Sequence, residues 1–283
     1  MPCSTHAYVM PSSILPDRHR APLTLLLGLF LLGMWVITAL AAHWIAPYSP
    51  TAVDFSALSQ PPSWQHWFGT DRFGRDVFSR VIYGGAQVLQ VAPAATLLGL
   101  ILGTLIGLFA AYYGRWVDEA IMRVIDAVMA LPLIVLAMLA LTLLGPSTLN
   151  VILVIGLVFS PLVARTVRAR ALIETRREYL QAAQMRGEGT AYQLLREILP
   201  NISGPLVVEG TIRLGYAVFT SATLGFLGLG AQPPNPDWGL MVSQNQTQLT
   251  TAPWTVLFPV LAIVLVVVGI GLVADGLRTR VAA

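Results

Sequence analysis

Long stretches without a charged residue dominate this sequence and limit what it can fold into. Four stretches of more than 30 residues lack Asp, Glu, Lys and Arg: 21–53, 81–114, 127–164 and 238–274. A helix that crosses the hydrocarbon core of a bilayer needs about 20 consecutive apolar residues. Each stretch is long enough for at least one such helix. The sequence therefore predicts an all-α membrane protein.

Six spanning helices follow from these stretches and from one less apolar segment. The third stretch is interrupted by Gly145-Pro146-Ser147, a turn signal that divides it into two helices. A further span carries Glu209 and Arg213. The six predicted spans are 23–46, 88–113, 121–144, 149–164, 204–227 and 252–274. An even number of spans puts both chain ends on the same side of the membrane.

The arginines indicate which side that is. All seventeen basic residues are arginine, and seven of them lie between Arg165 and Arg196. Arginine is enriched in cytoplasmic loops of membrane proteins, which predicts an N-in, C-in orientation. The predicted organisation is a cytoplasmic tail 1–22, an anchor helix 23–46, an external segment 47–87, a five-helix core 88–275 and a cytoplasmic tail 276–283. The core includes a cytoplasmic loop 165–201 and an external loop 228–251.

The first span also imitates a secretory signal peptide. Arg18 and Arg20 precede an apolar run, and Ala39-Leu40-Ala41 looks like a cleavage site. A signal peptide has an apolar region of about 7–15 residues, whereas this run has about 20. We therefore expect an uncleaved anchor.

Composition excludes several kinds of chemistry. The chain has no lysine, so it holds neither a Walker A phosphate loop nor a Schiff-base lysine. Its only cysteine is Cys3, and no histidine follows His66. No catalytic cluster of Ser, His and Asp is visible in the spans, so we expect a non-catalytic protein without a cofactor or metal of its own. A net charge of +3 gives little reason to expect nucleic acid as a partner.

Small residues recur at every fourth position of the second predicted span. They are Ala95, Gly99, Gly103, Gly107 and Ala111. Such a stripe lets another helix approach closely, although glycine is also common in membrane helices generally. We expect a packing face.

Two pairs of opposite charges lie inside the spans. Glu209 and Arg213 share a helix face. They either mark a transport path or satisfy each other near the cytoplasmic end, and we favour the second interpretation. Arg123 and Asp126 are interpreted in the same way, and Pro132 is expected to bend their helix.

The end of the fifth span and the loop after it leave two interpretations open. Small or mildly polar residues gather here and are followed by a proline-rich loop. The end of the span forms either a pore face or a packing face, and the loop is either a plain turn or a docking surface. The candidate path or gate residues are Thr220, Ser221, Thr223, Phe226, Asp237 and Trp238.

The cytoplasmic loop is the most informative segment. Its seven arginines and four glutamates indicate a solvated excursion from the membrane. A short helix over 178–186 is predicted to end near Gly187, and a second over 192–198 ends at Leu199-Pro200. This is either a plain solvated helix pair or a protruding helix that docks into a partner through Tyr179, Leu180, Ala182, Ala183 and Met185.

Part of this loop resembles the Glu-Ala-Ala signature of ABC importer permeases. The resemblance rests on Gln181-Ala182-Ala183, Gly187 and Leu199-Pro200. In that family the loop forms coupling helices that sit in a cleft of the ATPase subunit. The signature glutamate is Gln181 here, and the family isoleucine falls at Glu197, with Ile198 shifted by one position. The implied coupling residues are Glu178, Tyr179, Gln181, Ala182, Ala183, Met185, Gly187, Leu199 and Pro200.

Other segments resemble one branch of that family, the C-type permease subunit of dipeptide, oligopeptide and nickel importers. The similar segments are 66–80, 121–126 with Leu131-Pro132, 226–230, Gln232-Pro233-Pro234, Asp237-Trp238-Gly239 and Asp275-Gly276-Leu277-Arg278. The resemblance implies a type I ABC importer permease fold with six transmembrane helices.

The resemblance also implies the partners and the location. A second homologous permease would complete the translocation path, and one or two ATPase subunits would bind ATP and magnesium. A periplasmic or lipid-anchored solute-binding protein would dock outside, at the bacterial cytoplasmic (inner) membrane. The expected cargo is dipeptides or oligopeptides, and a nickel or metallophore importer is the alternative. An ion-gradient-driven carrier would show inverted repeats and ionisable groups at the midplane, and neither is evident.

Overall fold

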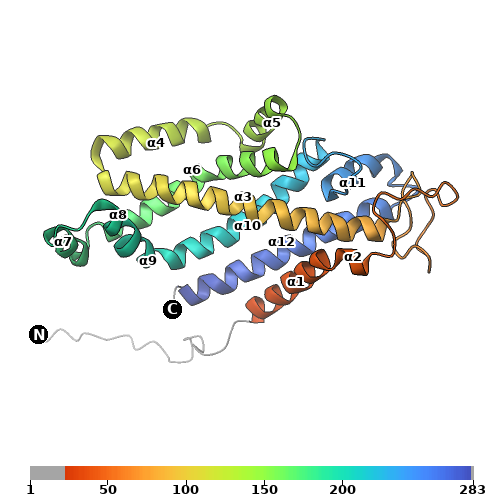
Figure 1. Ribbon diagram of the computed structural model, residues 1–283, viewed down its shortest axis with the longest axis horizontal. Helices are drawn as coiled ribbons and strands as arrows, with labels where there is room; N and C mark the ends of the chain where they lie inside the picture. Colours follow the sequence, from red (N-terminus) through yellow and green to blue (C-terminus); the bar gives the residue numbers. More distant parts are fainter. Residues whose placement is uncertain (1–22, 282–283) are drawn as a thin grey trace, which may run out of the picture.

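The computed structural model describes residues 23–281 and shows them as a helical bundle with one isolated β-bridge, Thr70–Asp76. The predicted tail 1–22 and residues 282–283 lie outside the described residues. Five long helices run along the long axis in Figure 1: α1 (Leu23–Leu40), α3 (Val77–Tyr113), α6 (Thr148–Glu174), α10 (Ser203–Phe226) and α12 (Trp254–Val281). The predicted all-α architecture is confirmed.

The number of helices that are long and apolar enough to span a membrane differs from the six predicted. Among residues 23–281, α1, α3, α6 and α12 meet this condition. The pair α4 (Arg115–Met129) and α5 (Leu133–Leu144) adds a fifth if the bent pair is counted as one span. The 24-residue α10 is less apolar because it carries Glu209, Arg213 and several small polar residues.

The third predicted span, 121–144, is broken rather than continuous. Its two halves, α4 and α5, meet at an angle of 83°. Pro132 stands at the break, where it lacks an amide hydrogen and clashes with the preceding turn, so the expected bend is present. The predicted pair of Arg123 and Asp126 is wrong, because each finds another partner. Arg123 pairs with Glu119 on the same helix, and Asp126 pairs with Arg165 of α6.

Three predicted spans lie between charged residues, whereas the helices that contain them continue past such a residue. α3 begins at Val77, where the Asp76 carboxylate accepts a hydrogen bond from the Ser79 amide at 2.8 Å. α6 continues to Glu174 and α12 to Val281, so both enter segments predicted as loop or tail. Arginine is a good helix former, and a positive charge at the cytoplasmic end of a span does not end the helix.

The centre of the bundle is the contact between α3 and α6. A Cβ atom added at Gly99, Gly103 or Gly107 would lie 3.0, 2.6 or 2.5 Å from a backbone oxygen of α6. The small residues of α3 therefore face α6 and let the two backbones touch. This is the close approach that small residues permit in membrane bundles.

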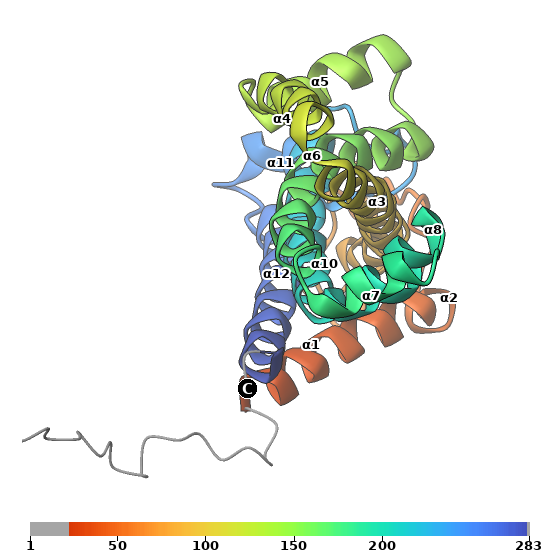
Figure 2. The same ribbon diagram turned by 90° about the vertical axis from the view of Figure 1, so that its left-hand side faces the viewer.

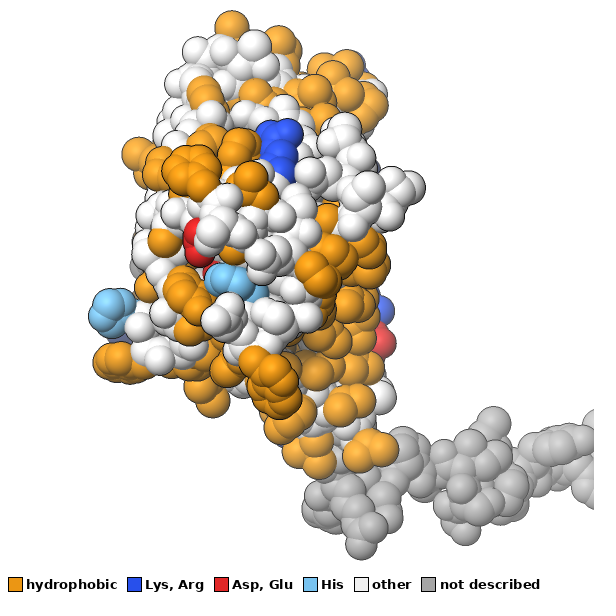
Figure 3. All heavy atoms as spheres, turned by 90° about the vertical axis from the view of Figure 1, so that its right-hand side faces the viewer, with side chains coloured by type: hydrophobic (Ala, Val, Ile, Leu, Met, Phe, Trp, Pro, Cys, Tyr) orange, Lys and Arg blue, Asp and Glu red, His pale blue; other side chains and the backbone are white. Residues whose placement is uncertain are grey.

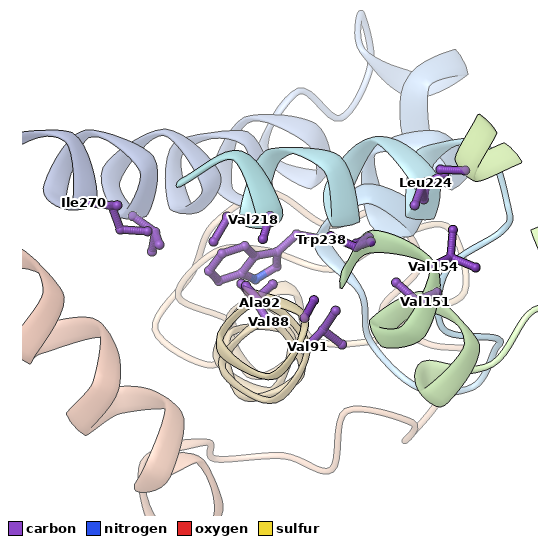
Figure 4. Close-up of a cluster of buried hydrophobic side chains, with 14 of the residues drawn as sticks. Val88, Val91, Ala92, Val151, Val154, Val218, Leu224, Trp238 and Ile270 are labelled. Carbon is purple, nitrogen blue, oxygen red and sulfur yellow. The ribbon is translucent and has the colours of Figure 1, made fainter. Parts of the chain in front are cut away.

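A second part of the core surrounds Trp238. Figure 4 shows its indole beside Val88 and Ala92 of α3, with Val218 of α10 nearby. Trp238 is the first residue of α11 (Trp238–Asn245), which is followed by the 3₁₀-helix η3 (Gln246–Gln248). The predicted external loop 228–251 thus contains a buried helix, and its start is part of the core.

The two ends of the bundle differ in character. One end carries α7 (Glu178–Met185), α8 (Thr190–Tyr192) and α9 (Leu199–Asn201), and the C-terminal end of α12 points the same way (Figure 1). We call it the coupling end, and we call residues 178–201 the coupling segment. The opposite end, which the sequence predicts to be external, carries α2 (Ala42–Ile45), α11 and the loops up to residue 76. Figure 3 views this end, where hydrophobic side chains form patches among other side chains and backbone.

Candidate coupling surface and transport path

The coupling segment is attached to the bundle by one face of α7. Leu180 and Ala183 are fully buried in a cluster at the coupling end. The cluster includes Leu108, Ala111, Val163, Val167, Ala171, Ile198 and Ile202. The sequence predicts Leu180 and Ala183 as part of a surface for a partner. The structure corrects this, because both side chains fix α7 to its own subunit.

The opposite face of α7 is exposed on this chain. Glu178, Gln181 and Met185 are exposed, and Met185 reaches 84% exposure. Residues separated by three and four positions share a helix face, so these three side chains form one surface. Tyr179 and Ala182 are half-buried beside it. Figure 2 views the molecule from this end and shows α7 in front of the long helices.

The end of α7 is fixed by Gly187. Its φ angle is +74°, in the left-handed region that L side chains rarely adopt. The Gly187 amide donates to the Gln184 carbonyl at 3.0 Å, and the Glu188 amide donates to the Ala183 carbonyl at 3.2 Å. These two bonds are the Schellman arrangement that closes a helix C-terminus. Nothing lies within 4 Å of a Cβ built here, so backbone conformation is what requires glycine.

A π-helix, η2 (Gln193–Ile198), follows α8. It contains Glu197 and Ile198, the two residues at which the sequence departs from the family signature before Leu199-Pro200. Ile198 is fully buried in the cluster described above. Glu197 lies 3.7 Å from the Arg186 guanidinium, which also donates to Glu188 at 2.8 Å. The shifted isoleucine therefore occupies the interior, and the glutamate joins an ion-pair network.

Gln193 is a residue that sequence reasoning missed. Its side chain is buried and accepts a hydrogen bond from the Tyr112 hydroxyl at 2.9 Å. Its amide group donates to the Glu188 carbonyl at 2.6 Å. Gln193 thus ties the end of α3 to the turn after α7. One glutamine in a polar segment carries no signal of this role in the sequence.

Tyr179 and the Leu-Pro pair complete the coupling segment. The Tyr179 hydroxyl donates to Glu174 at 2.9 Å. Partial burial, and then this hydrogen bond, raise the pKa of Tyr179 to about 12. The phenol is therefore protonated at neutral pH and remains a donor. Leu199 is half-buried against the cluster, whereas Pro200 is exposed.

Two of the candidate path residues lie inside the subunit. The Trp238 indole donates to the Val81 carbonyl at 2.8 Å, and the Asp237 carboxylate caps α11 by accepting from the Leu240 amide at 2.9 Å. Burial, opposed by hydrogen bonds from the Leu240 and Gly239 amides, raises the pKa of Asp237 to about 6. On this chain, both residues position α11 rather than line an exposed surface.

The other candidates are spread over α10. Ser221 is buried, while Thr220 and Thr223 are half-buried. The Thr223 hydroxyl donates to the Phe219 carbonyl at 2.9 Å. Thr223 and Phe226 lie on a groove of about 390 Å³ between α10, α11 and α12. The structure therefore brings these two together on one surface of the chain.

The two charged residues of α10, Glu209 and Arg213, form an ion pair. The Arg213 guanidinium and the Glu209 carboxylate lie 2.6 Å apart, and both side chains are largely buried. The arginine also lies over the Tyr216 ring at 5.7 Å.

The external segment forms a network that sequence reasoning treated only as a motif. His66 and Asp76 lie 2.9 Å apart, and Arg75 and Asp71 lie 2.7 Å apart. The buried Arg80 donates to the Pro50 carbonyl at 2.8 Å. Across residues 23–281, no three His, Cys, Asp or Glu side chains are placed to hold a metal ion.

Comparisons with known proteins place the chain among transport components. Residues 103–283 match the family described as "Binding-protein-dependent transport system inner membrane component". The dipeptide transport system permease protein DppC of Alkalihalophilus pseudofirmus is 42% identical over 253 residues, which cover 89% of this chain and 83% of that protein. The glutathione transport system permease protein GsiD of Escherichia coli is 40% identical over 244 residues, covering 86% of this chain and 80% of that protein.

A further relative and a solved structure agree with these matches. A putative peptide transport system permease protein of Brucella abortus is 41% identical over 261 residues, covering 92% of this chain and 87% of that protein. A chain of the MetNI methionine ABC transporter, solved in inward-facing conformations, covers 71% of this chain and 96% of its own length with a TM-score of 0.59. Its identity is 18%, so this likeness concerns the fold alone.

Proposed function

The chain belongs to the family of binding-protein-dependent transport system inner membrane components, and from this premise we propose that it forms half of the translocation path of an ATP-driven importer of short peptides. In this proposal the chain is a permease subunit without catalytic residues. It carries no Walker A phosphate loop, since the chain has no lysine.

The two faces of α7 are the observation that carries the proposal. One face is fixed in the bundle through Leu180 and Ala183, and the other presents Glu178, Gln181 and Met185. A helix held in this way transmits a push on its exposed face to α3 and α6, because packed interiors are stiff. Closure of an ATPase against α7 would then move the long helices that border the path.

The proposed partners follow from a permease that has no ATPase of its own. A second, homologous permease would complete the path, and one or two ATPase subunits carrying ATP and magnesium would contact the coupling segment. A solute-binding protein would deliver the cargo at the external end. The assembly would reside in the cytoplasmic membrane of a bacterium.

Short peptides are the proposed cargo because the relatives named above are permeases of dipeptide, peptide and glutathione systems. The cargo can be identified by mass spectrometry of ligands that copurify with the cognate binding protein. Bound peptides would support this assignment, and a nickel chelate alone would contradict it.

The coupling surface can be tested with Met185→Asp in the complete transporter. A charge on an exposed contact residue should weaken ATPase docking, since interface hot spots contribute about 2 kcal/mol or more. We expect transport-stimulated ATP hydrolysis and uptake to fall by about ten-fold or more. Thr279→Asp, also exposed at the coupling end but outside the coupling segment, is the matched control. Equal uptake by both variants would contradict the assigned surface.

A further inference from the structure

A hollow at the coupling end has no role in the proposed mechanism. It has a volume of about 510 Å³ and lies between the second half of α3, the first half of α4 and the coupling segment. Its lining is Leu105, Ile106, Leu108, Phe109, Ile121, Ala191, Leu194 and Leu195. Every lining side chain is apolar, and Leu105, Phe109 and Leu195 are about half exposed. Figure 2 shows α4 and α8 on different sides of α3 at this end.

Aromatic residues indicate the depth of the hollow in the membrane. Tyr112, Tyr113 and Trp116 follow its lining residue Phe109, and Trp116 is 77% exposed. Tyr and Trp concentrate where the hydrocarbon core meets the lipid headgroups. Leu105 and Phe109 lie one to two helical turns deeper, since a turn has about 3.6 residues. In the N-in orientation, the hollow is therefore at the level of the inner-leaflet acyl chains.

Two arginines lie close in the sequence to the residues that line the hollow. Arg115 begins α4 just beyond Tyr113, and Arg196 directly follows the lining residue Leu195. Both are exposed, and neither forms an ion pair within the described residues 23–281. The Arg196 guanidinium lies over the Tyr192 ring at 6.0 Å. The acidic residues Glu119 and Glu197, which also lie close in the sequence to the lining, pair with Arg123 and Arg186. Arg115 and Arg196 are therefore the charges available to an anion.

We propose that an anionic phospholipid of the inner leaflet occupies this hollow. Its acyl chain would lie against Leu105, Phe109 and Leu194, and its phosphate would meet Arg115 and Arg196. An apolar helix of another subunit would fill the hollow but leave both arginines without a counter-charge, which favours the lipid. One wall belongs to the coupling segment, so the lipid would brace η2 against α3 beside the Tyr112–Gln193 hydrogen bond.

A photocrosslinker at Phe109 tests this occupant in the complete transporter. The complex carrying p-benzoylphenylalanine at position 109 is placed in nanodiscs with equal amounts of phosphatidylglycerol and phosphatidylethanolamine, and the adducts are identified by mass. Each arginine near the surface favours an anionic lipid by about five-fold. We expect phosphatidylglycerol adducts to exceed phosphatidylethanolamine adducts by at least that factor. The preference should disappear in the double variant Arg115→Gln, Arg196→Gln.

The control position is Leu97, in the external half of α3. It is 59% exposed and apolar, so its adducts should follow the bulk lipid ratio. Bulk-ratio adducts at both positions, or crosslinks from position 109 to the second permease, would overturn the proposal. Native mass spectrometry of the complex without the crosslinker gives an independent reading. Retained phosphatidylglycerol that is lost in the double arginine variant supports the site, and equal retention contradicts it. None of these readings depends on the cargo.

Discussion

At the scale of single residues, the backbone of Gly187 is the feature that most clearly limits substitution. Its left-handed conformation is needed to close α7, whereas Gly189 two residues later has an ordinary φ of −67°. Space does not distinguish them, since nothing lies within 4 Å of a Cβ built at either glycine. The two glycines therefore separate the effect of backbone strain from that of an added methyl group.

We expect Gly187→Ala to disturb coupling and Gly189→Ala to be neutral. An L residue in the left-handed region is destabilised by about 1–2 kcal/mol, so the end of α7 should fray in the first variant. ATP-driven uptake by reconstituted complexes is the measurement. Gly187→Asn should fall between the two, because asparagine tolerates this conformation better. Equal uptake by both alanine variants would contradict the role of the Schellman turn.

Asp237 predicts a pH dependence of stability. Its pKa is raised by burial to about 6, above the usual value of 3.8. The folded state therefore holds this proton more firmly than the unfolded state does. The contribution of Asp237 to stability is greatest below about pH 4 and is lost as the pH rises to about 6.

Asp237→Asn should remove this dependence, because the amide oxygen still accepts from the Leu240 amide and carries no charge. The Tm of the variant relative to the native protein should rise between pH 4.5 and 7. Asp275→Asn, whose side chain is exposed, is the control and should show no such trend. A difference in Tm for Asp237→Asn that stays constant with pH would argue against a buried carboxyl that ionises near pH 6.

The sequence indicated which residues gather in the coupling segment but not how they divide between surface and interior. A short helix with apolar residues on more than one side can pack against its own subunit through either face. Ala183 was therefore expected at the partner surface, although it is fully buried. Gly187 was recognised, because a glycine after a short helix has a strong local preference. Gln193 could not be found, since its partners Tyr112 and Glu188 come from separate elements.

At the scale of elements, charge-free stretches identified the long helices but misplaced their ends. A stretch without charged residues shows which part of the chain lies in the hydrocarbon core. A helix, however, ends where its backbone hydrogen bonds end, and this point can lie outside the core. α6 thus continues through Arg165 and Arg168, which pair with Asp126 and Asp118 of α4. These ion pairs join two helices that are 39 and 50 residues apart in the chain at the paired positions. No local pattern predicts such contacts.

The hydrogen bond between α3 and η2 gives a prediction at this scale. Tyr112→Phe leaves the buried Gln193 side chain without a donor, which costs about 1–3 kcal/mol. We expect uptake per ATP hydrolysed to fall, because the coupling segment is held less firmly to α3. Tyr113→Phe is the matched control, since Tyr113 is half exposed and its removed group lies outside this contact. Identical coupling ratios would show that the Tyr112 contact is not needed.

At the scale of the whole molecule, the subunit has a tightly packed centre and a largely apolar outside. In the spanning windows, 50% of α3 and 56% of α6 are buried, against 22% of α1 and 28% of α12. Exposed apolar surface of this extent requires lipid or other apolar helices around it. A second groove, of about 370 Å³, runs along α10 and α12. Phe219 and Val267 line both this groove and the groove that contains Phe226, so the two grooves adjoin.

We expect this subunit to couple ATP hydrolysis on another chain to uptake. The most direct measurement is uptake of a labelled dipeptide into proteoliposomes that contain this chain, its partner permease and the ATPases, with binding protein and peptide outside and ATP inside. We expect uptake that requires internal ATP and binding protein and persists when ion gradients are collapsed. Uptake that survives ATP depletion but stops with the ion gradient would contradict this expectation.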